Sequence, residues 1–351
     1  MKRIYSIQYL RAVAALAVVA LHTGKRAGPE LPGGVKEWLE LGNAGVDLFF
    51  VISGFIMWSI STGSASSPGG FLVRRAVRVA PPYWIATALW VLMITVIGYD
   101  WISTSVPHLV KSFLFVPHYS PTFPDHILPV LVPGWTLNYE MFFYLVFAAT
   151  LVVSGPARFG ALAAVLLGLV LAGYLIAPTS AWAVTYTSPL LLEFLGGCVV
   201  AQLWMMRPGH FLRNLVVLCL GVGLLIWAGP HVGPHDYMER ALFYGGPCVL
   251  IVWGTLGLGA YVPRIRMLER LGDGSYAIYL FHLLLVVPLG EVWARLPMLH
   301  SGPGAILFVI VTMCLVSQMG VWIFRYLEQP MQRGLTALLL SKPGEKRLAS
   351  R

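Results

Sequence analysis

Charged residues are scarce in this sequence. Of its 351 residues, 58% are hydrophobic and only 11% are charged, whereas charged residues make up about 25% of a typical soluble domain. Apolar stretches recur along the whole chain, with no long polar stretch that could fold as a separate soluble domain. So few charges could not cover the surface of a soluble protein of this length. The composition therefore predicts an all-α, polytopic membrane protein.

Cysteine is also rare, and its few positions lie inside apolar stretches without metal-ligand spacing. We interpret all four as small packing residues and expect no metal site: Cys198, Cys219, Cys248 and Cys314. The net charge of +9 does not indicate nucleic acid as a partner, because the cytoplasmic loops of membrane proteins are rich in Lys and Arg.

Hydropathy predicts about ten membrane spans, since each needs about 20 predominantly apolar residues. The first could be mistaken for a signal peptide, but Arg11 interrupts it and no polar mature segment follows a cleavage site, so we expect an uncleaved span. The two longest connections on one side are 24–43 and 99–133. The predicted spans are 5–23, 44–61, 81–98, 134–154, 158–176, 187–205, 212–229, 242–260, 275–293 and 304–326.

Basic residues are distributed unequally between the two sides. With the N-terminus placed in the cytoplasm, 17 basic residues fall on that side and 6 on the other. The outer six are Lys25, Arg26, Lys36, Lys111, Arg240 and Arg295. The positive-inside rule then predicts that both termini are cytoplasmic. We expect a transmembrane domain over 1–330, a basic cytoplasmic tail over 331–351 and no fused soluble domain.

Arg11 and His22 are ionisable groups inside the first predicted span, where burial is costly and a function is the default hypothesis. They are 11 residues apart, so they share one helix face and stand about 16 Å apart along the axis. One face thus offers a cation in the cytoplasmic half and an imidazole near the outer end. The alternative is an arginine that snorkels or pairs with a carboxylate, and a histidine that ends the span at the interface.

Glu140 lies about 9 Å inside a predicted span that begins at the outer side near Gly134. His22 is at the same side, so the two side chains could meet at similar depth. A carboxylate that orients a histidine suits general acid–base chemistry. A structural ion pair between Glu140 and an arginine is the alternative.

Arg74, Arg75 and Arg78 precede the third predicted span. Three guanidinium groups at a cytoplasmic boundary can hold phosphates by bidentate hydrogen bonds. A topology signal with lipid headgroup contacts explains the same pattern, and both readings stay open on charge alone.

The remaining polar groups of the spans suggest a supporting network. Asp47 and His282, and with weaker support Glu193, are candidates for polar contacts that hold helices together. His108, His118 and His126 are spread through an outer loop with no metal-ligand spacing, so we interpret them as ordinary loop histidines.

Six motifs in order resemble the acyltransferase-3 family of membrane acyltransferases, which includes O-antigen and exopolysaccharide O-acetyltransferases. Arg11 and His22 stand in an Arg-x10-His arrangement, and Arg75 and Arg78 form an Arg-x-x-Arg element. The other carriers are G-V-D-L-F-F-V-I-S-G-F around Asp47, W-T-L-N-Y-E ending at Glu140, S-Y-A-I-Y-L-F-H ending at His282, and Y-L-E-Q-P with Glu328. The resemblance covers essentially the whole chain.

The resemblance implies an acyl-CoA donor, usually acetyl-CoA, used from the cytoplasmic side, and a carbohydrate hydroxyl as acceptor at the outer face. Arg75 and Arg78 would hold donor phosphates, Arg11 would line the acyl route, and His22 would be the central catalytic residue with Glu140 as partner. Whether His22 acts as a general base or carries the acyl group stays open.

The expected acceptor is an exopolysaccharide, an O-antigen or a lipid-linked glycan, and the expected location is the bacterial inner membrane. Membrane lipids are further partners, and a homo-oligomer or partners in polysaccharide assembly are compatible with the sequence. A transporter or flippase of a lipid-linked sugar is the alternative function, because it would also carry buried ionisable groups. A non-catalytic partner of a polysaccharide synthase is a further alternative, but it would not need Arg11, His22 and Glu140 together.

Overall fold

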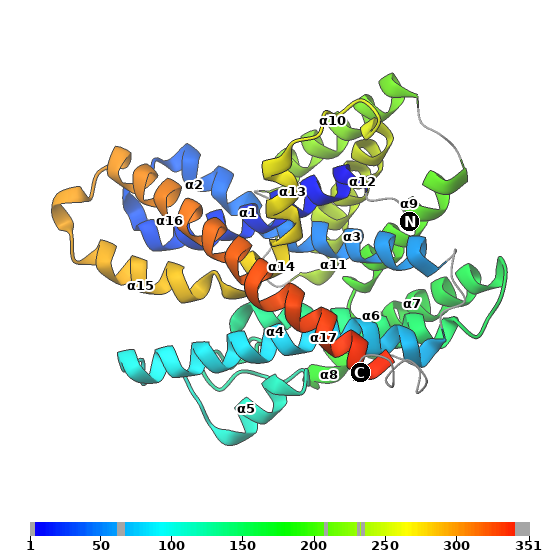
Figure 1. Cartoon of the computed structure of the whole chain (residues 1–351), viewed down its shortest axis with the longest axis horizontal. Coiled ribbons are helices and arrows are strands. Elements are labelled where there is room, and N and C mark those ends of the chain that lie inside the picture. Colours follow the sequence, from blue (N-terminus) through cyan, green and yellow to red (C-terminus); the bar gives the residue numbers. More distant parts are fainter. Residues whose placement is uncertain (1–3, 62–66, 207–209, 230–231, 233–235, 341–351) are drawn as a thin grey trace, which may run out of the picture.

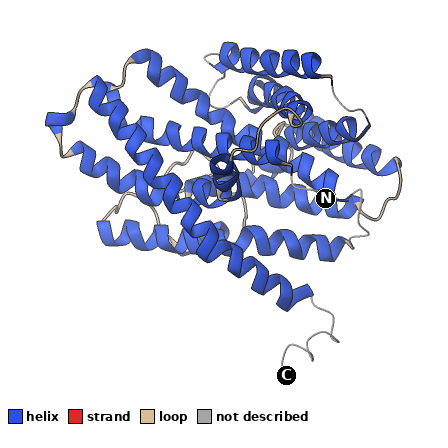
Figure 2. Cartoon of the chain, turned by 45° about the horizontal axis from the view of Figure 1, so that its top comes forward, coloured by secondary structure: helices blue, strands red, loops and turns tan. Residues whose placement is uncertain are grey.

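The computed structural model describes residues 4–61, 67–206, 210–229, 232 and 236–340. Their regular secondary structure is helical (Figure 2), apart from one isolated β-bridge between Tyr119 and Ile127. The predicted all-α class is therefore confirmed. Lys2, Arg3, Arg207 and most of the predicted basic tail lie outside the described residues.

The helices follow one another with short connections. The longer ones are α1 Tyr5–Ala27, α3 Ala44–Ser61, α4 Pro68–Ile97, α6 Trp135–Thr150, α7 Ala157–Ile176, α9 Leu191–Met206, α10 Phe211–Ala228, α12 Gly246–Leu258, α15 Leu283–Ala294, α16 Gly302–Ile323 and α17 Gln329–Leu340. The shorter ones are α2 Gly33–Glu40, α5 Val106–Phe113, α8 Ala181–Tyr186, α11 Tyr237–Arg240, α13 Arg266–Asp273 and α14 Ser275–Phe281, with π-helices at Ala241–Gly245 and Phe324–Glu328.

Eight helices of the described chain are long and apolar enough to cross a membrane, and the bent pair α14–α15 makes a ninth. The predicted number of about ten is therefore one too high by this measure. The difference is the predicted span 134–154, because α6 has only 16 residues and rises about 24 Å against a hydrocarbon core of about 30 Å.

Two predicted spans have different boundaries in the structure. The third begins 13 residues early, because Ser67 caps α4 by accepting a hydrogen bond from Gly70 N at 3.2 Å. The arginine cluster therefore lies on a helix and not in a loop. The span predicted at 275–293 is bent by 48° between α14 and α15, which puts His282 at the break.

α1 runs through the middle of the bundle and packs against α3, α13, α14 and α16 (Figure 1). Glycines allow the closest helix approach. A Cβ on Gly54 of α3 would lie 1.9 Å from Phe194 O of α9, and one on Gly197 of α9 would lie 2.0 Å from Val51 O. Small residues at such crossings let two backbones touch.

The connection between α4 and α6 is folded against α4, where α5 lies beneath it in Figure 1. Tyr83 OH and Trp84 Nε1 of α4 donate hydrogen bonds to the carbonyl groups of Ser112 and Phe113, at 3.0 and 2.8 Å. These contacts fix α5 beside a membrane helix, so side chains of this connection take part in a defined site.

Of the four cysteines, Cys198 and Cys248 are buried, as expected for packing residues, whereas Cys219 and Cys314 are exposed on the outside of the bundle.

Candidate active site

A cavity of about 450 Å³ lies between α1, α3, α4, α6 and α14. Its polar lining includes three arginines, Arg11, Arg75 and Arg78, and one carboxylate, Glu140. The rest of the wall is largely apolar, with Phe49, Ile56 and similar side chains from α3. Three cations against one lining anion make this cavity suited to a negatively charged ligand.

The charged groups of this cavity, which we call the arginine cavity, interact with side chains of their own helix and of neighbouring elements. Glu140 Oε1 accepts hydrogen bonds from Ser53 Oγ, at 3.2 Å, and from Tyr144 OH. Arg11 Nη1 donates a long hydrogen bond of 3.4 Å to Gln8 Oε1, one turn earlier on α1. Glu328, in the π-helix after α16, interacts electrostatically with Arg11 and Arg78 from outside the lining.

Arg75 interacts with Tyr144 and Glu140 but keeps an unused donor. Its Nε atom is buried without a hydrogen-bond partner, and its guanidinium lies 5.8 Å from the centre of the Phe71 ring. A buried cation with unused donors costs free energy until an anion pairs with it. The position of Arg75 therefore favours a bound phosphate or similar anion.

His22 lies at the other end of the same face of α1 and lines a second cavity, of about 270 Å³. Its Nδ1 is 2.9 Å from Val18 O, and because a carbonyl only accepts, Nδ1 carries the proton. The lone pair of the neutral ring is then on Nε2, which is the atom available as a base or nucleophile.

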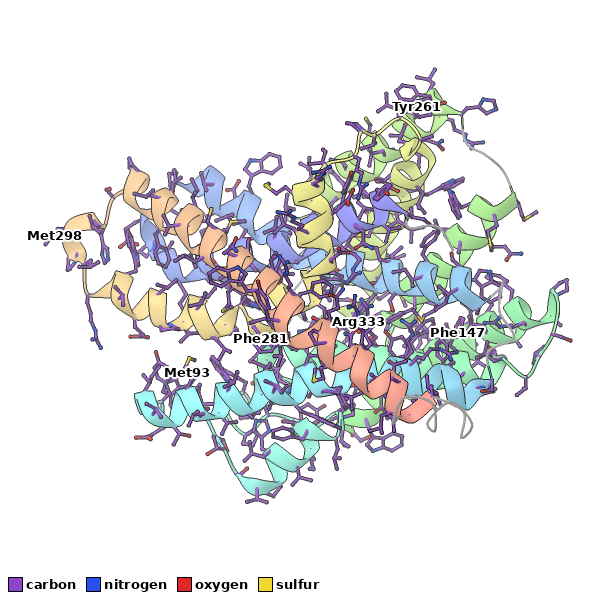
Figure 3. All side chains as sticks on the ribbon, in the orientation of Figure 1. Met93, Phe147, Tyr261, Phe281, Met298 and Arg333 are labelled. Carbon is purple, nitrogen blue, oxygen red and sulfur yellow. The ribbon has the colours of Figure 1, made fainter. Side chains whose placement is uncertain are left out.

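His282 lies beside His22, with ring centres 4.8 Å apart and ring planes tilted by 55°. The bend between α14 and α15 places it there, next to Phe281, which is only 1% exposed and lies near the centre of the bundle (Figure 3). Its Nδ1 donates to Tyr279 O at 2.6 Å, and its Nε2 is buried without a partner. Tyr279 lines the arginine cavity and His22 lines the second cavity. His282 contacts both residues and therefore lies between the two cavities.

The second cavity, which we call the outer cavity, combines aromatic and polar side chains. The aromatic lining consists of Trp90, Tyr99, Trp101 and Phe123. The polar lining consists of His22, Arg26, His108, Ser120, Thr122 and Glu291. Flat aromatic rings surrounded by hydrogen-bonding groups are suited to a ligand that has apolar faces and many hydroxyl groups.

The structure separates two residues that the sequence analysis placed together. Glu140 lines the arginine cavity and is hydrogen-bonded to Ser53 and Tyr144, whereas His22 lines the outer cavity. Residue spacing predicts the depth of each side chain along its helix but not the direction in which it points. The expected contact between His22 and Glu140 is therefore replaced by the contact between His22 and His282.

The arginine cluster is also divided. Arg75 and Arg78 line the cavity and Arg74 does not, because Arg74 is rotated by about 100° from Arg75 around α4. Asp47, in contrast, joins two elements through a side-chain contact with Arg240. It receives two hydrogen bonds from Arg240, from Nε at 2.9 Å and from Nη2 at 2.8 Å, with the carboxylate of Glu193 close by.

Two histidines that we interpreted as ordinary loop residues form a buried pair. His108 Nδ1 is 2.6 Å from His118 Nε2, and His118 Nδ1 is 2.7 Å from Val116 O. Burial, the main cause, and the neighbouring His118 lower the pKa of His108 to about 4. Their ten-residue separation in the sequence did not predict this contact, because it depends on how the connection between α4 and α6 folds. His126 is exposed.

No group of three or more His, Cys, Asp or Glu side chains in the described part of the chain could hold a metal ion. The residues of the two cavities instead offer hydrogen bonding, positive charge and proton transfer.

Comparison with known proteins identifies the family. The family model described as an acyltransferase domain matches residues 4–322. The exopolysaccharide production protein ExoZ of Rhizobium meliloti is 35% identical over 296 residues, which cover 84% of this chain and 90% of ExoZ. The acyltransferase MdmB of Streptomyces mycarofaciens is 27% identical over 321 residues, 81% of this chain and 79% of MdmB.

A third relative is longer than this chain. The peptidoglycan O-acetyltransferase OatA of Listeria monocytogenes is 24% identical over 371 residues, which cover 95% of this chain but only 56% of OatA. No solved structure matches the chain. The family match covers most of the sequence and includes both cavities, and we conclude that this protein is a membrane acyltransferase of the acyltransferase-3 family.

Proposed function

We propose that this protein is an O-acyltransferase of the bacterial inner membrane. It takes an acyl group, in the simplest case acetyl, from acyl-CoA bound at the cytoplasmic face. It transfers that group to a hydroxyl of a carbohydrate at the outer face, on an exopolysaccharide, an O-antigen or a lipid-linked glycan. The names of ExoZ and OatA, which refer to exopolysaccharide production and peptidoglycan O-acetylation, support a carbohydrate acceptor.

The observation that carries this proposal is the placement of two different cavities along one face of α1. Arg11 lines the cationic cavity and His22 lines the outer cavity, about 16 Å further along the helix axis. The chemical groups of acyl-CoA are arranged in the same order, because its phosphates and its thioester are at opposite ends of the pantetheine arm. One bound donor can thus place phosphates beside Arg75 and Arg78 while its thioester reaches toward His22.

The reaction in this arrangement needs one proton acceptor. The acceptor hydroxyl oxygen attacks the thioester carbonyl carbon, and His22 Nε2 removes the hydroxyl proton. The C–S bond then breaks, and His22 gives the proton from Nε2 to the thiolate of CoA as it leaves, which restores the neutral ring. The Val18 carbonyl, by holding the proton of His22 on Nδ1, keeps Nε2 free for this step.

The test is a transfer assay with purified protein. Carbohydrate from the surface of the producing cells is treated with mild base to remove O-acyl esters and is then incubated with acetyl-CoA labelled in the acetyl group. Protein-dependent, base-labile label in the carbohydrate is the expected result. Transport of a lipid-linked sugar across vesicles without any acyl transfer would support the flippase alternative and overturn the proposal.

A further inference from the structure

The buried pair His108–His118 has a defined direction of hydrogen bonding. His118 Nδ1 must carry a proton, because its partner Val116 O only accepts. In the neutral ring, His118 Nε2 is then an acceptor, so the proton in the 2.6 Å contact belongs to His108 Nδ1. The chain from Val116 to His108 therefore leaves the lone pair of His108 on Nε2.

His108 lines the outer cavity and is only 2% exposed. Its Nε2 has no hydrogen-bond partner in the described part of the chain, whereas Nδ1 is used by His118. Ser112, one turn later on α5, ties the segment down, because its Oγ donates to His108 O at 2.7 Å and accepts from Val130 N at 3.0 Å. The ring thus presents one acceptor to the cavity from a fixed position.

Trp90 provides the complementary group in the same cavity. It comes from α4, it is 4% exposed, and its Nε1 is a buried donor without a partner. An unpaired buried donor costs free energy comparable to a lost hydrogen bond. A ligand that both donates and accepts, as a hydroxyl group does, satisfies both groups.

We propose that His108 and Trp90 form a sugar-recognition subsite of the outer cavity, in which one hydroxyl of the acceptor donates to His108 Nε2 and another accepts from Trp90 Nε1. His118 is a positioning residue, because it fixes which nitrogen of His108 carries the proton. The inference rests on the proposed function, since it assigns the acceptor to the outer cavity. It adds that the connection between α4 and α6 determines which sugar is acylated.

Two variants test the subsite from opposite sides. Trp90→Phe keeps an aromatic ring but removes the unpaired N–H together with the five-membered ring that carries it, and His118→Phe keeps a ring but removes the nitrogen that accepts from His108. The acceptor Michaelis constant, KM, should rise about 2- to 12-fold in each, the effect of one lost neutral hydrogen bond. The values of kcat and of KM for acetyl-CoA should stay near wild type. His118→Gln, whose Oε1 can accept from His108, should recover part of the loss.

The assay uses the full-length protein in detergent, labelled acetyl-CoA and base-deacylated surface polysaccharide at varied concentration. His126→Ala is the matched control, because this histidine is on the same connection but exposed and outside the cavity lining. Trp90→Phe keeps the proposal testable if His118→Phe does not fold, since an aromatic ring remains at position 90 and the lost ring atoms face the cavity. An unchanged acceptor KM in Trp90→Phe, or an equal rise in His126→Ala, would overturn it. Failure of wild-type transfer would instead refute the proposed function.

Discussion

Arg75→Ala is the substitution whose effect follows most directly from the arginine cavity. The side chain lines the cavity, and its buried Nε has no hydrogen-bond partner. If Arg75 binds a phosphate of the donor, its removal deletes a charge-assisted hydrogen bond of about 1.5–3 kcal/mol. The Kd of acetyl-CoA should then increase about 10- to 150-fold. Arg75→Lys should restore only part of the affinity, because an ammonium group cannot form the bidentate contact.

The stability of the same variant separates a binding role from a structural one. Arg75 interacts with Glu140 and Tyr144, so its removal should lower the melting temperature, whereas the loss of affinity should persist at temperatures at which the variant is fully folded. Calorimetric titration with acetyl-CoA and thermal melting of the purified protein measure the two effects. Arg74→Ala, which removes the same charge from the same helix but outside the cavity lining, is the control. Wild-type affinity in Arg75→Ala, or an equal loss in Arg74→Ala, would refute the assignment.

Three further predictions concern stability, pH and orientation. Arg240→Ala leaves the buried Asp47 carboxylate without its partner and should destabilise the protein by about 3–5 kcal/mol, while the double variant with Asp47→Asn should melt at a higher temperature than Arg240→Ala alone. Because the pKa of His108 is lowered to about 4, the acceptor KM should be constant from pH 8 to about pH 5 and rise below it, as His108 Nε2 gains a proton. Other groups near His108 also titrate or carry charge: His118, Lys111, His22, Arg26 and Glu291. Trp90→Phe is a useful comparison, because it leaves all of these groups in place and the pH dependence of its acceptor KM should have the same shape as that of the wild type. Finally, with the four native cysteines replaced, an impermeant thiol reagent should label Asp125→Cys but not Ala76→Cys in intact cells, and the reverse pattern would overturn the donor-inside orientation.

Hydropathy predicted most of the membrane helices, because the cost of exposing backbone and charge to lipid acts on every span alike. It did not predict the bend at His282 or the early start of α4. Both depend on local contacts, such as the cap at Ser67, which are independent of apolar content. Hydropathy cannot distinguish a loop from a helix that continues beyond its apolar stretch. The polar first turns of α4, which carry the arginines, were therefore predicted to lie outside a helix.

Side-chain positions within one helix were predictable, whereas contacts between side chains of different helices were not. The 11-residue spacing of Arg11 and His22 correctly predicted a shared face, since helix geometry fixes it. The partner of Glu140 was not predictable, because similar depth in the membrane leaves the rotation of each helix undetermined. The pair His108–His118 required the folded connection between α4 and α6, whose hydrogen bonds to Ser112 and Phe113 carry no sequence signature.

Acetyl transfer by His22→Gln is the most direct test of whether His22 removes the proton of the acceptor hydroxyl. This variant keeps a polar side chain but lacks a base that accepts a proton near neutral pH. The purified variant and the wild type are given labelled acetyl-CoA and base-deacylated surface polysaccharide, and acetyl-CoA binding is measured in parallel. We predict that transfer is abolished while the Kd of acetyl-CoA stays within about twofold of wild type, because the donor phosphates bind about three helical turns away. Substantial transfer by His22→Gln would contradict the account and point to His282 or Glu140 as the group that removes the proton.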